Sequence, residues 1–183
     1  MITLERSIRV TMKRTVLLAL TAVFVPVAAD AATIQTSPVF VALGGPPAGF
    51  PVGEEVPGAE ATLIRNKDGV AFIIRTGDLP EGALTAWLFD FPCDNIADCS
   101  PSGPPIFGTS DTVGQDGKAH LAFGISEADG VVDAEADTFV VLILDHGPVD
   151  PKLIHLHLST VLDGMPVQTV IVGPHHPRGG RRH

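Results

Sequence analysis

Histidine is the residue type whose spacing in this sequence could support chemistry. His155 and His157 are separated by one residue within the apolar segment 153–160, which we expect to be a strand. Side chains two positions apart in a strand project from the same face, so the two imidazoles could bind one copper or zinc ion together. Such a site needs a further ligand, for which the candidates are His146, just after the preceding expected strand, and His120.

The simpler interpretation of the two strand histidines is structural. In an amphipathic edge strand, His155 and His157 would lie on the solvated face, while Ile154, Leu156 and Leu158 would face the core. A metal site and a solvated strand face therefore remain as alternatives for this segment, and the second needs no cofactor.

Catalytic templates are missing from the sequence. It contains no Gly-x-Ser-x-Gly elbow, phosphate-binding loop, Gly-x-Gly-x-x-Gly or His-Glu-x-x-His motif. The sequence His146-Gly147-Pro148 is typical of a turn, because Gly permits unusual backbone angles and Pro fixes the next φ. With one Trp and no Tyr, aromatic platforms for sugars are also scarce. These features favour a protein that is not an enzyme.

The first element that we expect along the chain is an export signal. Residues 1–31 contain an apolar run over 16–27 that is preceded by basic residues and followed by Ala29-Asp30-Ala31, which suits cleavage after Ala31. The basic residues are Arg6, Arg9, Lys13 and Arg14. The apolar run is shorter than the roughly 20 residues of a membrane-spanning helix. We therefore expect an exported protein, periplasmic or extracellular, without a transmembrane anchor after cleavage.

The two cysteines agree with export. Cys93 and Cys99 are closely spaced in a polar stretch, and such a pair in an oxidising compartment is expected to form a disulfide. The loop it closes is short, so the bridge would remove little unfolded-state entropy. We expect it to shape a loop more than to stabilise the fold.

The charge of the chain limits its partners. The whole sequence has a formal net charge of −9, and without residues 1–31 it would have 8 basic and 19 acidic residues, a net charge of −11. An acidic surface of this kind repels phosphate backbones, which argues against a nucleic-acid partner. The sequence does not indicate which partner the protein has.

Short apolar segments between Pro and Gly residues predict an all-β fold. We expect eight strands, near 33–43, 59–65, 70–76, 84–91, 118–125, 138–145, 153–160 and 167–172. Such a pattern favours one antiparallel β-sandwich domain, Ig-like or Greek-key, over 32–173, with a closed β-barrel as the alternative. Segments 44–58 and 99–108, rich in Pro, are expected to be surface loops, and the polar tail over 174–183 to be disordered.

Two local patterns are more specific. The sequence Asp68-Gly69 between the second and third expected strands indicates a tight hairpin. In the segment 84–91, Trp87 would lie on one face of the expected strand and Leu84 and Leu88 on the other, so both faces are apolar. That strand should therefore be covered on both sides.

The order of several motifs resembles a family of exported bacterial proteins that has no established activity. The motifs are Asp78-Leu79-Pro80-Glu81-Gly82, a Leu-x-Pro-Gly-type turn; the Trp87 strand; Phe91-Pro92-Cys93 with Cys99; and Asp145-His146-Gly147-Pro148. They span about 59–160. The chain departs from the family pattern at Asp145, where Ser is expected, and at Val140 or Val141, where a polar residue or His is expected. The resemblance implies export and a β fold but transfers no chemistry.

Together these features predict an exported, non-enzymatic β-protein that serves as a binding or structural module for an unknown ligand. The alternative is a copper- or zinc-binding protein that uses His155 and His157 with His146 or His120. The two differ in whether the purified protein contains stoichiometric metal.

Overall fold

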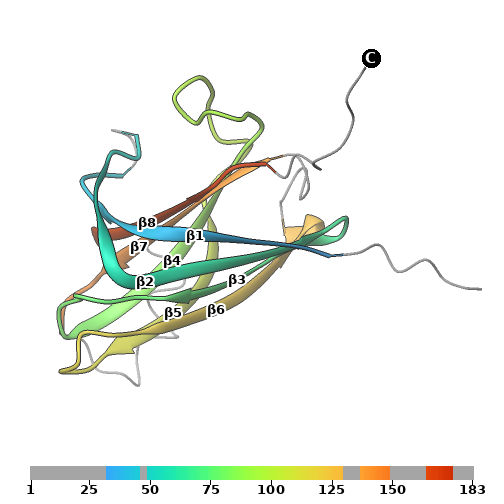
Figure 1. Ribbon diagram of the computed structural model, residues 1–183. Coiled ribbons are helices and arrows are strands. Elements are labelled where there is room, and N and C mark those ends of the chain that lie inside the picture. Colours follow the sequence, from blue (N-terminus) through green and yellow to red (C-terminus); the bar gives the residue numbers. More distant parts are fainter. Residues whose placement is uncertain (1–31, 46–48, 130–136, 149–163, 175–183) are drawn as a thin grey trace, which may run out of the picture.

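The computed structural model describes residues 32–45, 49–129, 137–148 and 164–174 (Figure 1). Within these ranges the chain forms eight β-strands and one turn of 3-10 helix. The elements are β1 (Thr33–Ala42), β2 (Val52–Asn66), β3 (Gly69–Arg75), β4 (Gly82–Phe91), β5 (Ile106–Val113), β6 (His120–Ser126), η1 (Glu127–Asp129), β7 (Thr138–Asp145) and β8 (Met165–Val172). The expected all-β architecture is confirmed.

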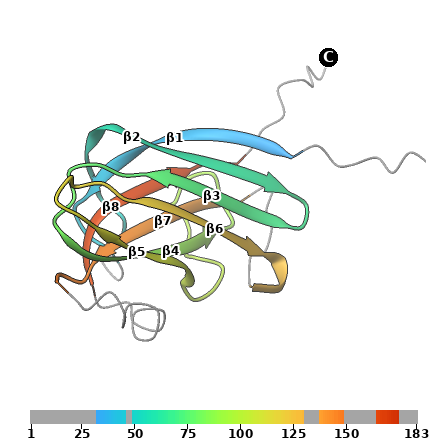
Figure 2. The same ribbon diagram turned by 90° about the horizontal axis from the view of Figure 1, so that it is seen from below.

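All eight strands belong to one antiparallel sheet in the order β5-β4-β7-β8-β1-β2-β3-β6. The sheet curls until its edge strands β5 and β6 lie side by side, as both views show (Figures 1 and 2). A Cβ atom on Gly108 of β5 would stand 2.7 Å from ring atoms of Phe123 in β6. This nearly closed sheet corresponds to the barrel arrangement rather than to two separate sheets.

The interior of the curled sheet is filled by apolar side chains from every strand. Fully buried members include Leu63, Phe72, Leu84, Leu121 and Ile143. An eight-stranded barrel either is filled by side chains or holds one small ligand, and here apolar side chains occupy the interior.

Strand β4 is buried on both faces, as its sequence predicted. Leu84 and Leu88 belong to the interior cluster, whereas Trp87 and Phe89 belong to a second cluster on the outer face of β4 and β7. Phe50, from the segment before β2, packs its ring edge-on against Phe89 at 4.7 Å between centroids. The loops at this end of the sheet thus act as a cover for the outer face.

The disulfide between Cys93 and Cys99 is present, with Cα atoms 6.5 Å apart. Both cysteines and Ile96 pack against the outer apolar cluster. The bridged loop therefore presents apolar atoms to the outer face of β4.

The hairpin expected at Asp68-Gly69 joins β2 to β3. Asn66 pairs with Gly69, and Asn66 Oδ1 accepts a hydrogen bond of 2.9 Å from the backbone N–H of Asp68. Gly69 has φ 154°, and a Cβ there would stand 2.4 Å from the Ile125 carbonyl oxygen. Only glycine fits so close to the β6 backbone.

Two segments expected to be loops contain strand. β5 (Ile106–Val113) begins inside the predicted loop 99–108. Its consecutive polar residues Thr109, Ser110 and Asp111 are half-buried beside β4 rather than alternating with apolar ones. β2 begins at Val52 instead of residue 59, because bulges accommodate Pro57 and Gly58 within the strand. The strand expected at 153–160, the signal at 1–31 and most of the tail lie outside the described residues.

Candidate functional site

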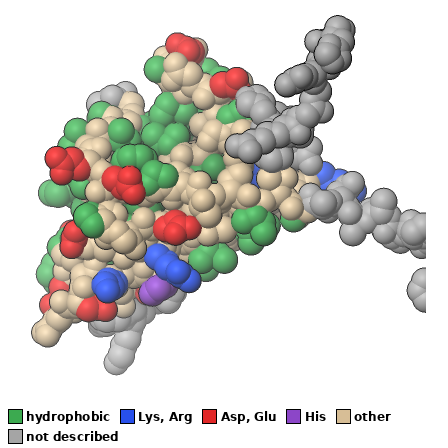
Figure 3. Space-filling view, in the orientation of Figure 1, with side chains coloured by type: hydrophobic (Ala, Val, Ile, Leu, Met, Phe, Trp, Pro, Cys, Tyr) green, Lys and Arg blue, Asp and Glu red, His purple; other side chains and the backbone are tan. Residues whose placement is uncertain are grey.

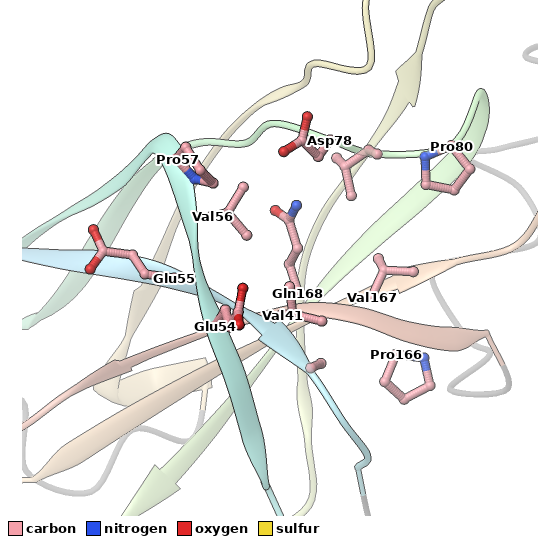
Figure 4. Close-up of a pocket in the computed structure, with 12 residues that line it drawn as sticks. Val41, Glu54, Glu55, Val56, Pro57, Asp78, Pro80, Pro166, Val167 and Gln168 are labelled. Carbon is pink, nitrogen blue, oxygen red and sulfur yellow. The ribbon is translucent and has the colours of Figure 1, made fainter.

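A pocket of about 400 Å³ opens at the seam of β1, β2 and β8, where the turn between β3 and β4 approaches them. Figure 4 shows that its wall combines apolar side chains with three acidic residues and one amide. We call it the Gln168 pocket, after the amide in its wall. It lies outside the closed interior and is open to solvent.

Gln168 is the buried polar group of this pocket. Its side chain is 3 % exposed, and its Nε2 donates to the Gly77 carbonyl oxygen. That bond assigns the amide orientation and turns Oε1 toward the space between Val56 and Asp78 (Figure 4). Oε1 has no hydrogen-bond partner in the described part of the chain. A buried acceptor without a donor costs about 1–3 kcal/mol. A ligand that donates a hydrogen bond to Oε1 would remove this cost.

The backbone of β8 holds Gln168 at this position. Gln168 pairs with Val41 of β1 and with Ile143 of β7. Only Phe40 and Val41 pair with β8 across the β1–β8 seam. The next residues of the two strands, Ala42 and Val167, are not paired with each other and line the pocket.

Two bulges in β2 bring acidic side chains to the pocket. Opposite β1, the pairing moves from Pro38–Glu60 to Phe40–Glu55 and then to Ala42–Val52. The extra residues on β2 break the alternation of faces, and consecutive Glu54 and Glu55 both line the pocket. In Figure 4 the carboxylate of Glu54 points inward, whereas Glu55 points away along the rim.

The turn that contains Asp78 forms the opposite wall. Asp78 has φ 52°, a left-handed conformation in a residue other than glycine, which costs free energy and persists only where surrounding contacts impose it. Leu79 N–H donates to the Gly117 carbonyl at 3.1 Å, and Thr76 Oγ1 donates to the Ala119 carbonyl at 3.0 Å. These bonds hold the turn, and therefore the backbone of Asp78, beside the pocket.

The pocket is negatively charged and partly apolar. Its acidic residues are Glu54, Glu55 and Asp78, and no lysine or arginine lines it among the residues that the structure describes. Val41, which is 40 % exposed, supplies apolar surface. On the face shown in Figure 3, acidic and hydrophobic side chains are intermixed, while the lysine and arginine atoms lie near its lower edge and at its right side.

The histidines expected to bind metal are only partly described. His155 and His157 lie outside the described residues. His120 is exposed at the start of β6, opposite Arg75, and His146 is bonded through Nε2 to the Thr85 hydroxyl at 2.8 Å. No group of three His, Cys, Asp or Glu side chains within the described ranges could hold a metal ion. The metal site stays a prediction.

The bond between Thr85 and His146 pairs a hydroxyl with an imidazole, as in nucleophilic catalysis. Thr85 is 0 % exposed, however, and its oxygen already accepts a hydrogen bond from Trp87 Nε1 at 3.0 Å. The hydroxyl is thus bonded within the fold, to His146 and to Trp87. The arrangement is therefore a structural connection between β4 and the turn after β7.

Sequence reasoning did not find the Gln168 pocket. One signal was available, since Gln168 lies among apolar residues in Val167–Val172 and a polar side chain there must be buried. The pocket also depends on the bulges of β2, which the sequence does not reveal.

Comparisons with known proteins add no assignment. No family model, no curated protein and no solved structure matches the chain. No helix among the described residues has the length and apolar character needed to cross a membrane.

Proposed function

We propose that this chain is an exported, non-enzymatic binding module whose ligand occupies the Gln168 pocket. The observation that carries the proposal is the buried Oε1 of Gln168, an acceptor without a donor in the wall of a pocket of about 400 Å³. Ligand sites typically combine apolar walls with a few polar groups that fix orientation. The filled sheet interior supports a site at the seam rather than inside.

Export is supported by two observations. The Cys93–Cys99 disulfide is compatible with an oxidising compartment, and residues 1–31 have the pattern of a cleaved signal. N-terminal sequencing of the protein recovered outside the cytoplasm should give Ala32 as the first residue. A mature protein that retains Met1 would contradict export by a cleaved signal.

The binding function is tested by thermal unfolding of the protein with a panel of small anionic, neutral and cationic compounds. At least one compound should raise the Tm of the wild type, because a ligand that binds the native state stabilises it. The same compound should leave the Tm of Gln168→Met unchanged. A panel without any such compound, or a shift that persists in the variant, would remove the pocket as the binding site.

A further inference from the structure

The chemistry of the pocket selects one class of ligand. Gln168 Oε1 is an acceptor, and so are the carboxylate oxygens of Glu54 and Asp78. The two carboxylates are exposed to solvent, whereas Oε1 is buried and without a donor, and all three can accept a hydrogen bond from a ligand. A ligand rich in acceptors, such as a carboxylate or phosphate, would meet repulsion from two negative charges and find no donor side chain in return.

The charges specify a cation. Glu54 and Asp78 lie on opposite walls, on β2 and on the turn after β3, and in Figure 4 the amide of Gln168 lies between them. No lysine or arginine of the described ranges lines the pocket beside either carboxylate. Two acidic groups without a basic neighbour concentrate negative potential in the pocket, which attracts a positive group.

The lining also indicates which cation. Among the twelve described residues of the wall there is no aromatic side chain, so the cage that recognises quaternary ammonium groups is absent from it. A quaternary ammonium group also has no N–H to donate. Val41, Pro166 and Val167 provide apolar surface beside the acceptors, which suits the methylene stem of an aliphatic chain.

We propose that the Gln168 pocket binds an N–H-bearing organic cation, a primary ammonium or a guanidinium group on a short aliphatic stem. One N–H donates to Gln168 Oε1, the charge is balanced by Glu54 and Asp78, and the stem lies on the apolar wall. This inference rests on the proposed function. Such a cation occurs in free amines and in lysine or arginine side chains of peptides.

The test is isothermal titration calorimetry of the full exported chain with four probes. n-Butylammonium and Nα-acetyl-argininamide contain both a positive charge and N–H donors. Butyltrimethylammonium keeps the charge without a donor on the nitrogen, and Nα-acetyl-citrullinamide has a neutral urea in place of the guanidinium of Nα-acetyl-argininamide. We expect the first two to bind, and each matched probe to bind at least tenfold more weakly. Added salt should weaken the binding.

Three outcomes overturn the inference. Equal affinity for butyltrimethylammonium would show that no N–H is recognised. Equal affinity for Nα-acetyl-citrullinamide would show that the guanidinium charge is not recognised. The absence of binding by all four probes would remove the cation site. If an anionic or neutral compound in the thermal panel then stabilised the wild type through Gln168, the binding function would stand and only the cation would be excluded.

Variants assign the binding to the pocket. Glu54→Gln with Asp78→Asn removes both charges at nearly constant shape, and Asn tolerates the positive φ of Asp78. This double variant should bind n-butylammonium at least tenfold more weakly than the wild type. The control is Glu60→Gln, an exposed residue of β2 that does not line the pocket. Equal losses in the double variant and the control would overturn the assignment.

A second pair of probes distinguishes the two sources of the cation. The capped peptide Gly-Lys-Gly contains the same ammonium group as n-butylammonium but adds backbone on either side. Tighter binding of the peptide would assign the site to basic side chains, because peptide groups then contribute contacts. Tighter binding of the free amine would assign it to small amines.

Discussion

The hydroxyl oxygen of Thr85 lies 2.8 Å from Nε2 of His146. The same oxygen accepts a hydrogen bond from the indole N–H of Trp87 at 3.0 Å. Since Thr85 is fully buried, its own proton requires an acceptor, and the imidazole nitrogen is the one within reach. The backbone N–H of His146 donates to the Ala83 carbonyl oxygen at 2.9 Å, and that of Ala83 donates to the Gly147 carbonyl oxygen at 3.0 Å, which strengthens the same connection. One hydroxyl thus joins the outer aromatic cluster to the turn after β7.

Replacing Thr85 with Val should lower the free energy of unfolding by roughly 2 kcal/mol, because the buried Trp87 N–H and His146 Nε2 both lose their partner while the shape is kept. Urea unfolding followed by fluorescence measures this directly, since Trp87 is the single tryptophan of the chain. Thr36→Val is the matched control, at an exposed position of β1. Equal effects of the two substitutions would contradict the connection.

Closure of the sheet depends on Gly108. A Cβ at this position of β5 would stand 2.7 Å from the Phe123 ring, which in turn stacks on Phe72 at 5.4 Å between centroids. Gly108→Val should therefore separate the two edge strands and destabilise the protein by about 1–3 kcal/mol. Gly103→Val is the control, because nothing lies within 4 Å of a Cβ there. Thermal unfolding of both variants gives the comparison, and a harmless Gly108→Val would contradict the closed arrangement.

Arg65 is a buried cation that bonds to the backbone just before β7 and just after β8. Its guanidinium donates to the carbonyl oxygens of Asp137 at 3.0 Å and Gly173 at 2.7 Å, and it lies over the Phe139 ring at 5.1 Å. Lysine cannot reproduce this planar, forked contact. Arg65→Lys should lower the free energy of unfolding by about 2 kcal/mol, measured in urea. Arg75→Lys, at an exposed position of β3, should have little effect, and equal losses would contradict the role of Arg65.

The sequence predicts those strands in which apolar residues recur at regular intervals. β4 is the clearest case, since the alternation of Leu84, Trp87 and Leu88 encodes a separate apolar cluster on each face. β5 could not be predicted in the same way. Its residues Thr109-Ser110-Asp111-Thr112 are polar, and they form a strand because β4 offers an unpaired edge.

The candidate site was beyond the reach of sequence reasoning for a related reason. Gln168 and Asp78 are far apart in the chain, and they meet because β8 pairs with β1 while the Asp78 turn is bonded to Gly117. Glu54 joins them through a bulge, a local departure from alternation. Periodic patterns predict regular strands, whereas this pocket is formed where the strands are irregular.

Asp129 should titrate at lower pH than an ordinary aspartate. Its carboxylate accepts hydrogen bonds from the backbone N–H of Ser126 at 3.0 Å and from the Ser126 hydroxyl at 2.7 Å, and these two bonds lower its pKa. A lowered pKa means that the stabilisation is present above the ordinary pKa of the group and is lost as the pH falls through the lowered value. Carboxyl carbon NMR gives the midpoint. Ser126→Ala should raise it by removing the hydroxyl bond, whereas Ser100→Ala, in an exposed loop, should leave it unchanged. An unchanged midpoint in Ser126→Ala would show that the hydroxyl does not stabilise the carboxylate.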